Sequence, residues 1–419
     1  MMITVTMVTV TAIPRKETKN VDPTKGWVLI YGRRKVGKTF LVRNFIKHDM
    51  YVLVKRGGGA LIVGGPLKRT DDHGQVMEFI TRALEDGKIV VVDEFQRLPD
   101  EFLDMLQMVH PKGGLVLLGS AMHVAQNLTS KKSPLLGLVS EVHLSLLAPT
   151  DIFLGLSGVM PAEQALALSP YMRDPWALRH LNGRPEETIA RVLEHSGSAV
   201  PALIGEVFLD EDRFLSEVYE SIVRAIASGK NTLKEVSDQL FARKLIKAND
   251  PSQVRPYVKV MEGMDLIERV PLYDTRGNFY SVRSKLMELY YYLDEKYDIE
   301  AARPSLIREV IAERLPFHVQ FFVGELLAEL LDGTFRYAIT ETSDLDIVIT
   351  RRNNPIFVGE VKWSRRVDRG DVAKFLRNCE AFKCRKALIS KVPLDTDELE
   401  VLTPDKILEM ARSLRSDLK

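Results

Sequence analysis

The chain has 419 residues, a formal net charge of +1, 45% hydrophobic residues and 27% charged residues. This composition excludes a largely disordered chain, and the length suffices for about two to four folded domains. Because the net charge is near zero, any nucleic-acid partner would have to be bound by a local basic surface. No run of about eighteen apolar residues and no signal-peptide pattern is found, so we expect a cytoplasmic protein without a membrane partner.

The first 26 residues predict an N-terminal strand and a linker. In residues 1–13 apolar residues alternate with Thr, with one slip at Met7, which is typical of an edge strand with a bulge. Residues 14–26 are rich in Lys, Thr and Pro, and we interpret them as a linker.

An apolar run at residues 27–31 is followed by Gly-x-x-x-x-Gly-Lys-Thr and then by helical spacing. This order predicts a strand, a Walker A loop and a helix. The glycines let backbone N–H groups surround phosphate oxygens, Lys38 can reach the β- and γ-phosphates, and Thr39 can bind Mg²⁺. We therefore predict a nucleoside triphosphate site formed by Gly32, Arg33, Arg34, Lys35, Val36, Gly37, Lys38, Thr39 and Phe40.

The glycine-rich span at residues 57–65 follows a predicted buried strand at residues 50–54. It fits either a mobile loop near the nucleotide or a bend between two short strands, and we favour the bend.

Residues 89–92 form a second apolar run, which is followed by Asp93 and Glu94. This is the Walker B pattern, in which a buried parallel strand brings Asp93 to the Mg²⁺ and Glu94 orients or deprotonates the attacking water. A third apolar segment at residues 114–122 includes Ser120, which either senses the γ-phosphate or caps the next helix. Strands alternating with helices predict a parallel sheet, and we assign residues 27–150 to an ATPase core.

Beyond residue 150 two helix-rich regions are predicted. Residues 151–212 lack strand signals and predict a helical lid. Residues 213–295 predict three helices followed by a two-stranded wing, which is a winged helix. Residues 219–293 carry twelve Lys and Arg against nine Asp and Glu. We weigh DNA binding through the third helix equally against a role in packing or nucleotide sensing.

The last region, residues 296–419, contains Asp346 before Glu360-Val361-Lys362 on the next predicted strand. This is the PD-(D/E)xK nuclease pattern. The period of two places Glu360 and Lys362 on one face, Asp346 and Glu360 can share Mg²⁺ or Mn²⁺, and Lys362 can activate water. Glu325, on a predicted helix, can complete the metal shell. The alternative is a set of paired surface charges on amphipathic strands, and for Glu325 a solvated helix flank.

Several of these motifs together resemble one family. Gly32–Thr39 looks like the GRRRVGKT loop of archaeal-type ATPases of the STAND/AAA+ group, and Asp93-Glu94-Phe95-Gln96 resembles their DEFQ motif. Gly359–Trp363 is similar to the GEVKW signature of the nuclease-like domain at the C-terminus of many members. One departure is that Leu138 and Val139 stand where the family often has arginines, so we cannot name an arginine finger.

The resemblance implies that the nucleotide is ATP, that DNA is a partner and that the chain can form a homo-oligomer. The expected fold class is α/β: a P-loop NTPase with a parallel sheet, a helical lid, a winged helix and a C-terminal α/β restriction-endonuclease-like domain. Our first hypothesis is an ATPase that acts on DNA and cuts it with Asp346, Glu360 and Lys362. The second is a nucleotide-gated switch or scaffold whose C-terminal domain binds DNA or a protein without cleaving.

Overall fold

The computed structural model describes residues 12–64, 68–119, 134–196, 200, 202, 213–273, 275–338, 345–363, 367–394 and 398–417. The chain forms two compact units, one spanning Pro14–Leu146 and the other joining Ile13 to the residues from Leu147 onward. The predicted N-terminal strand at residues 1–13 lies almost entirely outside the described residues, and so does Ser120.

The Pro14–Leu146 unit is built on a seven-stranded sheet with the order β4-β3-β2-β5-β6-β1-β7. The five strands from β2 to β7 in this order are parallel, whereas β3 and β4 are added antiparallel at one edge. The strands are β1 (Trp27–Tyr31), β2 (Met50–Val54), β3 (Ala60–Val63), β4 (Lys68–Thr70), β5 (Ile89–Asp93), β6 (Gly114–Gly119) and β7 (Val139–His143). The glycine-rich span thus includes a bend between two strands, β2 and β3, as we favoured.

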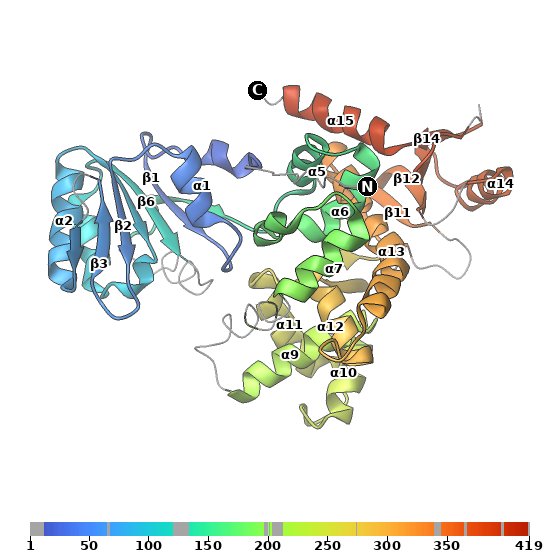
Figure 1. Cartoon of the computed structure of the whole chain (residues 1–419), viewed down its shortest axis with the longest axis horizontal. Coiled ribbons are helices and arrows are strands. Elements are labelled where there is room, and N and C mark those ends of the chain that lie inside the picture. Colours follow the sequence, from blue (N-terminus) through green and yellow to red (C-terminus); the bar gives the residue numbers. More distant parts are fainter. Residues whose placement is uncertain are drawn as a thin grey trace, which may run out of the picture. The chain divides into compact units, whose positions relative to one another are not determined.

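Both faces of this sheet are buried, which explains why its central strands are continuous apolar runs. α2 (His73–Glu85) and α3 (Glu101–Val109) pack on one face against side chains such as Leu29, Val92 and Leu117. α1 (Lys38–Phe45) packs on the other face against Ile30, Val91 and Leu118. Figure 1 shows these helices on opposite sides of the sheet. The described part of this unit also contains two 3₁₀ helices, η1 (Lys16–Asn20) and η2 (Phe95–Arg97).

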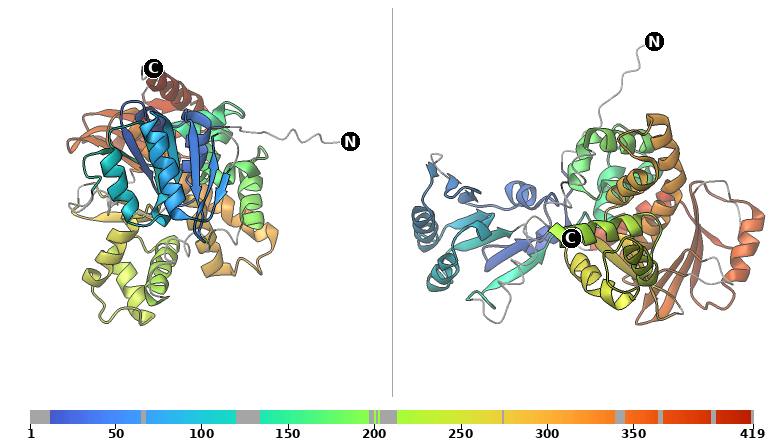
Figure 2. Two further views of the ribbon diagram at one scale, coloured as in Figure 1. Left: turned by 90° about the vertical axis from the view of Figure 1, so that its left-hand side faces the viewer. Right: turned by 90° about the horizontal axis from the view of Figure 1, so that it is seen from below.

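The second unit combines helices, a hairpin and a five-stranded sheet (Figure 2). Its helices are α5 (Pro149–Ser157), α6 (Ala162–Met172), η3 (Pro175–His180), α7 (Pro185–Ser196), α9 (Arg213–Ala227), α10 (Leu233–Ala242), α11 (Pro251–Gly263), α12 (Lys285–Tyr297), α13 (Pro304–Leu330), α14 (Arg369–Asn378) and α15 (Pro404–Asp417). Its strands are β8 (Ile267–Pro271), β9 (Asn278–Val282), β10 (Thr334–Arg336), β11 (Ile347–Arg351), β12 (Asn354–Lys362), β13 (Arg385–Ser390) and β14 (Glu400–Leu402).

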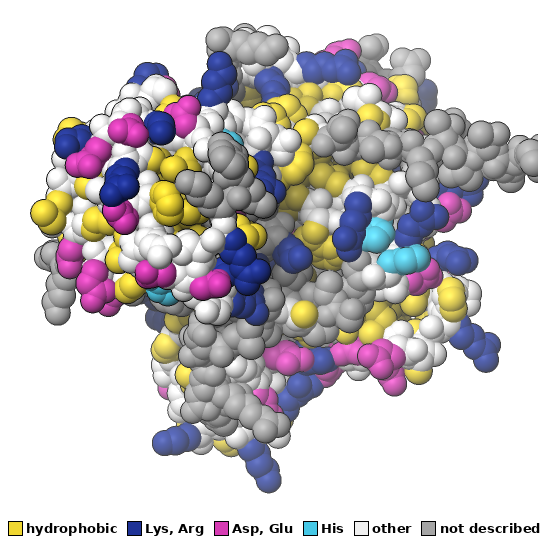
Figure 3. All heavy atoms as spheres, turned by 60° about the vertical axis from the view of Figure 1, so that its left-hand side comes forward, with side chains coloured by type: hydrophobic (Ala, Val, Ile, Leu, Met, Phe, Trp, Pro, Cys, Tyr) yellow, Lys and Arg dark blue, Asp and Glu magenta, His cyan; other side chains and the backbone are white. Residues whose placement is uncertain are grey.

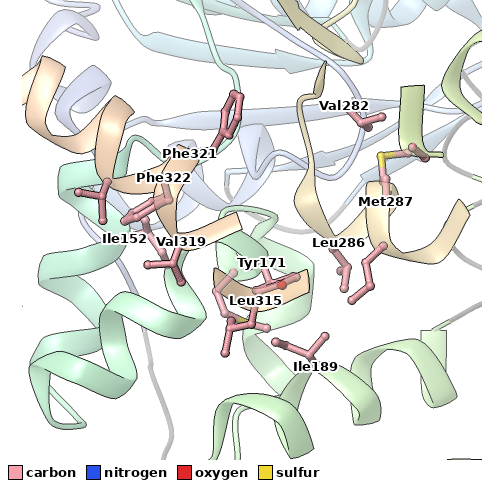
Figure 4. Packing of buried hydrophobic residues seen from close by; sticks show 14 of the residues in the cluster. Ile152, Tyr171, Ile189, Val282, Leu286, Met287, Leu315, Val319, Phe321 and Phe322 are labelled. Carbon is pink, nitrogen blue, oxygen red and sulfur yellow. The ribbon is translucent and has the colours of Figure 1, made fainter. Parts of the chain in front are cut away.

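The helix α13 is the centre of this second unit. It contacts α5, α6, α7, α12 and α15 as well as strands β10 and β11. In Figure 4 its side chains Val319 and Phe322 lie close to Ile152 of α5, and Leu315 lies close to Tyr171 of α6. One hydrophobic core is therefore shared by the predicted lid, the predicted wing and the C-terminal sheet.

The hairpin β8–β9 is also joined to the five-stranded sheet through the backbone. Tyr337, next to β10, donates its N–H to the carbonyl oxygen of Pro271 at 3.1 Å and accepts from the N–H of Tyr273 at 2.9 Å. Leu272 and Tyr337 form a parallel bridge. The Tyr337 ring packs against Phe279 of β9, with 4.9 Å between ring centroids.

A buried cluster of charges lies where the hairpin meets α12. The ammonium of Lys285, which is only 4% exposed, lies 3.1 Å from Glu268 and 3.1 Å from Glu288. His318 of α13 contacts Glu288 through Nε2 at 3.3 Å and the hydroxyl of Tyr171 through Nδ1 at 2.8 Å. Ionic contacts thus connect the same elements as the hydrophobic core.

On the face shown in Figure 3, acidic and basic side chains are interspersed, in keeping with the near balance of charge. Within the described part of the chain, no helix combines the length and the apolar character needed to span a bilayer.

Candidate nucleotide site and candidate acidic site

The phosphate loop connects β1 to α1, and two glycines allow its path. A Cβ at Gly32, whose φ is +151°, would lie 2.0 Å from the carbonyl oxygen of Leu144. Gly37 has a φ of +96° and is the N-cap of α1. Because side chains rarely adopt this left-handed region and the space at Gly32 is filled by backbone, both positions require glycine.

Lys38 lies buried across the loop. Its ammonium donates hydrogen bonds to the carbonyl oxygens of Gly32 at 2.6 Å and Arg33 at 2.9 Å. Burial lowers the pKa of Lys38 to about 8, although the carboxylates of Glu94 and Asp93 act in the opposite direction. The lysine is therefore held by the loop carbonyls, which it would leave to bind a phosphate group. The negative charges of Asp93 and Glu94, at the end of β5, act on it.

Thr39 and Asp93 meet at the carboxyl end of β5. The Thr39 hydroxyl donates to Oδ2 of Asp93 at 2.8 Å, and the Tyr51 hydroxyl donates to the same oxygen at 2.5 Å. Burial and the Asp93 charge raise the pKa of Tyr51, so Tyr51 stays a donor. The Thr39 and Asp93 oxygens fit Mg²⁺, which prefers hard oxygen ligands.

Glu94 follows β5 with a left-handed backbone, at a φ of +59°. Its Oε2 accepts a hydrogen bond from Gln96 Nε2 at 2.7 Å and lies 3.1 Å from Arg97 Nη2. Arg97 also donates to the Val54 carbonyl oxygen at 2.7 Å. The turn after β5 thus holds the carboxylate in one direction.

The other predicted loop residues differ in exposure. Arg33 is buried, Arg34 is half-buried and Lys35 is exposed, with a left-handed φ of +68°. Phe40 is 46% exposed and packs edge to face against Phe45 of the same helix. The structure brings Lys38, Thr39, Asp93 and Glu94 together, while Phe40 points outward.

Two contacts in this site were missed in the sequence analysis. Tyr51, which binds Asp93, lies in the predicted buried strand, where a polar side chain among apolar ones was the available signal. Arg15, inside the predicted linker, donates from Nη1 to the carbonyl oxygen of Val36 at 2.8 Å. Nothing in the Lys- and Thr-rich composition of residues 14–26 separates this arginine from a solvated one.

The second site lies on the five-stranded sheet, whose order is β10-β11-β12-β13-β14. β11 and β12 are antiparallel, with Ile347 opposite Gly359, so the next pair in this register is Asp346 and Glu360. Paired residues point to the same face of a sheet. Oδ2 of Asp346 accepts a hydrogen bond from the N–H of Val361 at 2.7 Å, which fixes this carboxylate beside Glu360.

Glu360 is 3% exposed and forms an ion pair with Lys362 through Oε1. Its other oxygen, Oε2, is buried and has no hydrogen-bond partner among the residues that the structure describes. A buried carboxylate oxygen without a donor is costly, and a cation is a chemically suitable partner for it. Asp346, Glu360 and Lys362 are therefore brought together, and the donor set fits a divalent metal.

The prediction that Glu325 completes this set needs correction. Its Oε2 lies 2.5 Å from Nη1 of Arg173. Burial would raise the pKa of Glu325, but the positive charges of Arg173 and Arg283 outweigh it and lower the pKa. Glu325 is thus neutralised by arginines, and its contacts with described residues do not include Asp346 or Glu360, so we leave it out of the proposed metal site.

No group of three or more His, Cys, Asp or Glu side chains converges on a metal position anywhere in the described residues. A metal at Asp346 and Glu360 would take its remaining ligands from water or substrate, as Mg²⁺ commonly does.

The geometry of the first site defines a class of protein. β6 lies between β1, which leads into the phosphate loop, and β5, which ends in Asp93. This is the additional-strand arrangement of P-loop nucleoside-triphosphatase domains. Residues 24–148 match the family model described as an AAA domain. The chain therefore carries an AAA domain in its first unit.

Among curated proteins, the chain is 26% identical over 302 residues to the uncharacterized protein MJECL04 of Methanocaldococcus jannaschii. The match covers 63% of this chain and 63% of that relative, which is less than two thirds of the relative's length.

Two solved structures from Aeropyrum pernix are similar at 13% identity. The ORC2 protein in ADPNP–ADP complexes matches over 69% of this chain and 88% of that chain, with a TM-score of 0.38. The ORC1 protein in complex with DNA matches over 70% and 96%, with a TM-score of 0.29. We draw no conclusion from matches with TM-scores this low.

Proposed function

We propose that this protein binds and hydrolyses ATP and acts on DNA, with a metal-dependent nuclease-like site in its second unit. The observation that carries the ATPase part is the convergence of Lys38 with Thr39 and Asp93 at the end of β5. ATP as the nucleotide follows from the resemblance and from the AAA domain.

In this proposal the loop N–H groups and Lys38 bind the phosphates, while Thr39 and Asp93 hold Mg²⁺. Bound Mg²⁺ would neutralise the charge that develops on the phosphates. Glu94, held by Gln96 and Arg97, would orient the attacking water. Ser120 remains a proposed γ-phosphate sensor, since it lies outside the described residues.

For the nuclease-like site, at residues 296–419, we propose that Asp346 and Glu360 hold Mg²⁺ or Mn²⁺ and that Lys362 orients the water. The unpartnered Oε2 of Glu360 supports this assignment. Lys362 can also stabilise negative charge on a phosphate oxygen, because its ammonium lies on the same strand face as Glu360.

For DNA engagement we propose the winged helix at residues 213–295. The order of α9, α10, α11 and the hairpin supports it. Lys244, Lys247, Arg255 and Lys259 are all exposed, and none of them forms an ion pair with another described residue. Residues 151–212 are proposed as the lid of the ATPase core, and assembly into a homo-oligomer belongs to the same proposal.

A second candidate is a nucleotide-gated switch whose C-terminal domain binds DNA or a protein without cleaving it. It is favoured by the contact between Lys362 and Glu360, because an ion pair can neutralise the acid without any metal. Slow turnover and tightly retained nucleotide would then be expected.

The two candidate functions are distinguished by measuring ATP hydrolysis together with cleavage of plasmid, linear and branched DNA. Wild type is compared with Lys38→Ala and Glu360→Ala, with Glu325→Ala as a matched control on the arginine-paired acid. We expect Lys38→Ala to lose hydrolysis and Glu360→Ala to lose cleavage. A wild-type protein that leaves all substrates uncut with Mn²⁺ in every nucleotide state would contradict the nuclease assignment and favour the switch.

A further inference from the structure

Arg15 makes an unusual set of contacts for a residue ahead of the first strand. It is 7% exposed, and the three hydrogen bonds that it donates to carbonyl oxygens of described residues lie within the Pro14–Leu146 unit. Nη1 donates to Val36 at 2.8 Å, and Nη2 donates to Ser145 at 2.7 Å and to Leu146 at 3.2 Å. Nε lies 3.4 Å from Glu17, the carboxylate that balances its charge.

Val36 stands immediately before Gly37 in the phosphate loop, and the peptide bond between them is trans. A trans peptide is planar, so its carbonyl oxygen and its N–H point in opposite directions. Because Arg15 binds the Val36 carbonyl oxygen, the N–H of Gly37 points away from the Arg15 guanidinium. Because Gly37 is also the N-cap of α1, this N–H stands at the positive end of the helix.

A charged donor can keep this peptide in place. Gly37 has a left-handed φ of +96°, and a glycine peptide without a fixed neighbour can rotate at low cost. A guanidinium can donate to several acceptors in one plane, so Arg15 can hold the loop and the chain after β7 at once. A lysine has no such planar set of donors.

We infer that Arg15 is a positioning residue for nucleotide binding, which fixes the Val36–Gly37 peptide so that its N–H faces the phosphates. This inference rests on the proposed ATP binding. It assigns a role in the nucleotide site to a residue outside the Walker motifs.

The test measures the affinity of the full chain for a fluorescent ATP analogue with Mg²⁺. The variants are Arg15→Gln, Arg15→Lys and Arg15→Ala, with Lys16→Ala as a matched control, since Lys16 is an exposed cation on the same segment. We expect the three Arg15 variants to bind at least about tenfold more weakly, as befits the loss of a charged hydrogen bond, and Lys16→Ala to bind like wild type. Guanidinium ion at millimolar concentration should restore part of the affinity of Arg15→Ala, which a general packing role would not predict.

Thermal unfolding of the nucleotide-free variants is measured alongside. Affinities of Arg15→Lys and Arg15→Gln within twofold of wild type would overturn the inference, and so would a loss of affinity that only follows a loss of folded protein. If the Arg15 variants bind nucleotide normally, the proposed ATP binding is retained and the positioning role of Arg15 is rejected. If wild type binds no nucleotide, both fall.

Discussion

At the scale of a single residue, burial and a bound triphosphate have opposite effects on the protonation of Lys38. Burial among loop carbonyls lowers its pKa to about 8 from an ordinary value of 10.5. Between these two pH values the unfolded chain binds more protons than the folded chain, so the stability of the nucleotide-free protein rises with pH. A bound triphosphate reverses the preference, because its negative charge favours the protonated lysine.

We therefore expect nucleotide affinity to be flat below about pH 8 and to fall above it. At pH 9 the dissociation constant should be about tenfold larger than at pH 7, since most of the free lysine has then lost its proton. Titration calorimetry across pH 7–9 measures this effect. Lys38→Arg, whose guanidinium stays charged, should bind with a constant affinity over the same range; an equal decline in that variant would assign the effect to other groups.

Glu360 and Glu325 are both acids with little exposure, and their contacts predict opposite results. Glu360→Gln should abolish Mn²⁺ binding in the absence of nucleotide while changing the free energy of unfolding by about 1 kcal/mol or less, because its ion-pair partner Lys362 is partly exposed to water and its other oxygen has no hydrogen bond to a described residue to lose. Glu325→Gln should leave Mn²⁺ binding intact but cost about 3 kcal/mol, because Arg173 loses its charged partner. Calorimetric Mn²⁺ titration and urea unfolding give the two readouts. Loss of Mn²⁺ binding in Glu325→Gln would return that residue to the metal site.

At the scale of single elements, α11 offers a test of DNA engagement. Arg255 and Lys259 lie four residues apart and so share one face of the helix, and both are exposed. If they contact phosphates, the double substitution to Ala should weaken duplex binding and reduce the salt dependence of the affinity by about 2 in log–log slope.

The matched control for this experiment is Arg243→Ala. Arg243 lies between α10 and α11 but is paired with Glu295, so its charge is already compensated within the protein. Fluorescence anisotropy at several salt concentrations would measure both variants. Equal losses in the two would indicate a general effect of net charge instead of a DNA-contacting face.

The elements also show what the sequence could and could not predict. The strands β1, β5 and β6 were predicted because strands buried on both faces are continuous apolar runs. The sequence predicts the helix that carries Glu325 but not that α13 begins as early as Pro304, since neighbouring elements on several sides obscure its helical periodicity. Glu325 was assigned to the wrong set of charges because spacing along a helix does not reveal which distant arginine packs against it.

The strand pattern was the more reliable guide at the acidic site. Asp346 and Glu360 were placed together because the nuclease pattern puts them on neighbouring strands, and the antiparallel pairing of β11 and β12 sets them opposite each other. Arg15 could not be anticipated, because its partners are backbone oxygens, which have no signature in the sequence.

At the scale of the whole molecule, the division into two compact units predicts two unfolding events. Nucleotide at one hundred times its dissociation constant should stabilise the Pro14–Leu146 unit by about 2.7 kcal/mol and raise its midpoint by roughly 10 °C. Lys285→Met should lower the other midpoint, because Glu268 and Glu288 would lose a buried partner at a cost of about 3–5 kcal/mol. Differential scanning calorimetry separates the two events. A single transition that responds to both changes would show that the units unfold together.

The backbone pairing of Tyr337 with Pro271 and Tyr273 limits how this chain can be divided. A fragment beginning at residue 296, where a nuclease-like domain was predicted to start, would leave the N–H and C=O of Tyr337 without their partners at an exposed edge. It would also uncover the aromatic rings that pack beside β10. Unpaired, apolar sheet edges invite pairing with other copies. The C-terminal region is thus predicted as a separate domain from the sequence, but its contacts tie it to the hairpin, and the two should be expressed together as one fragment.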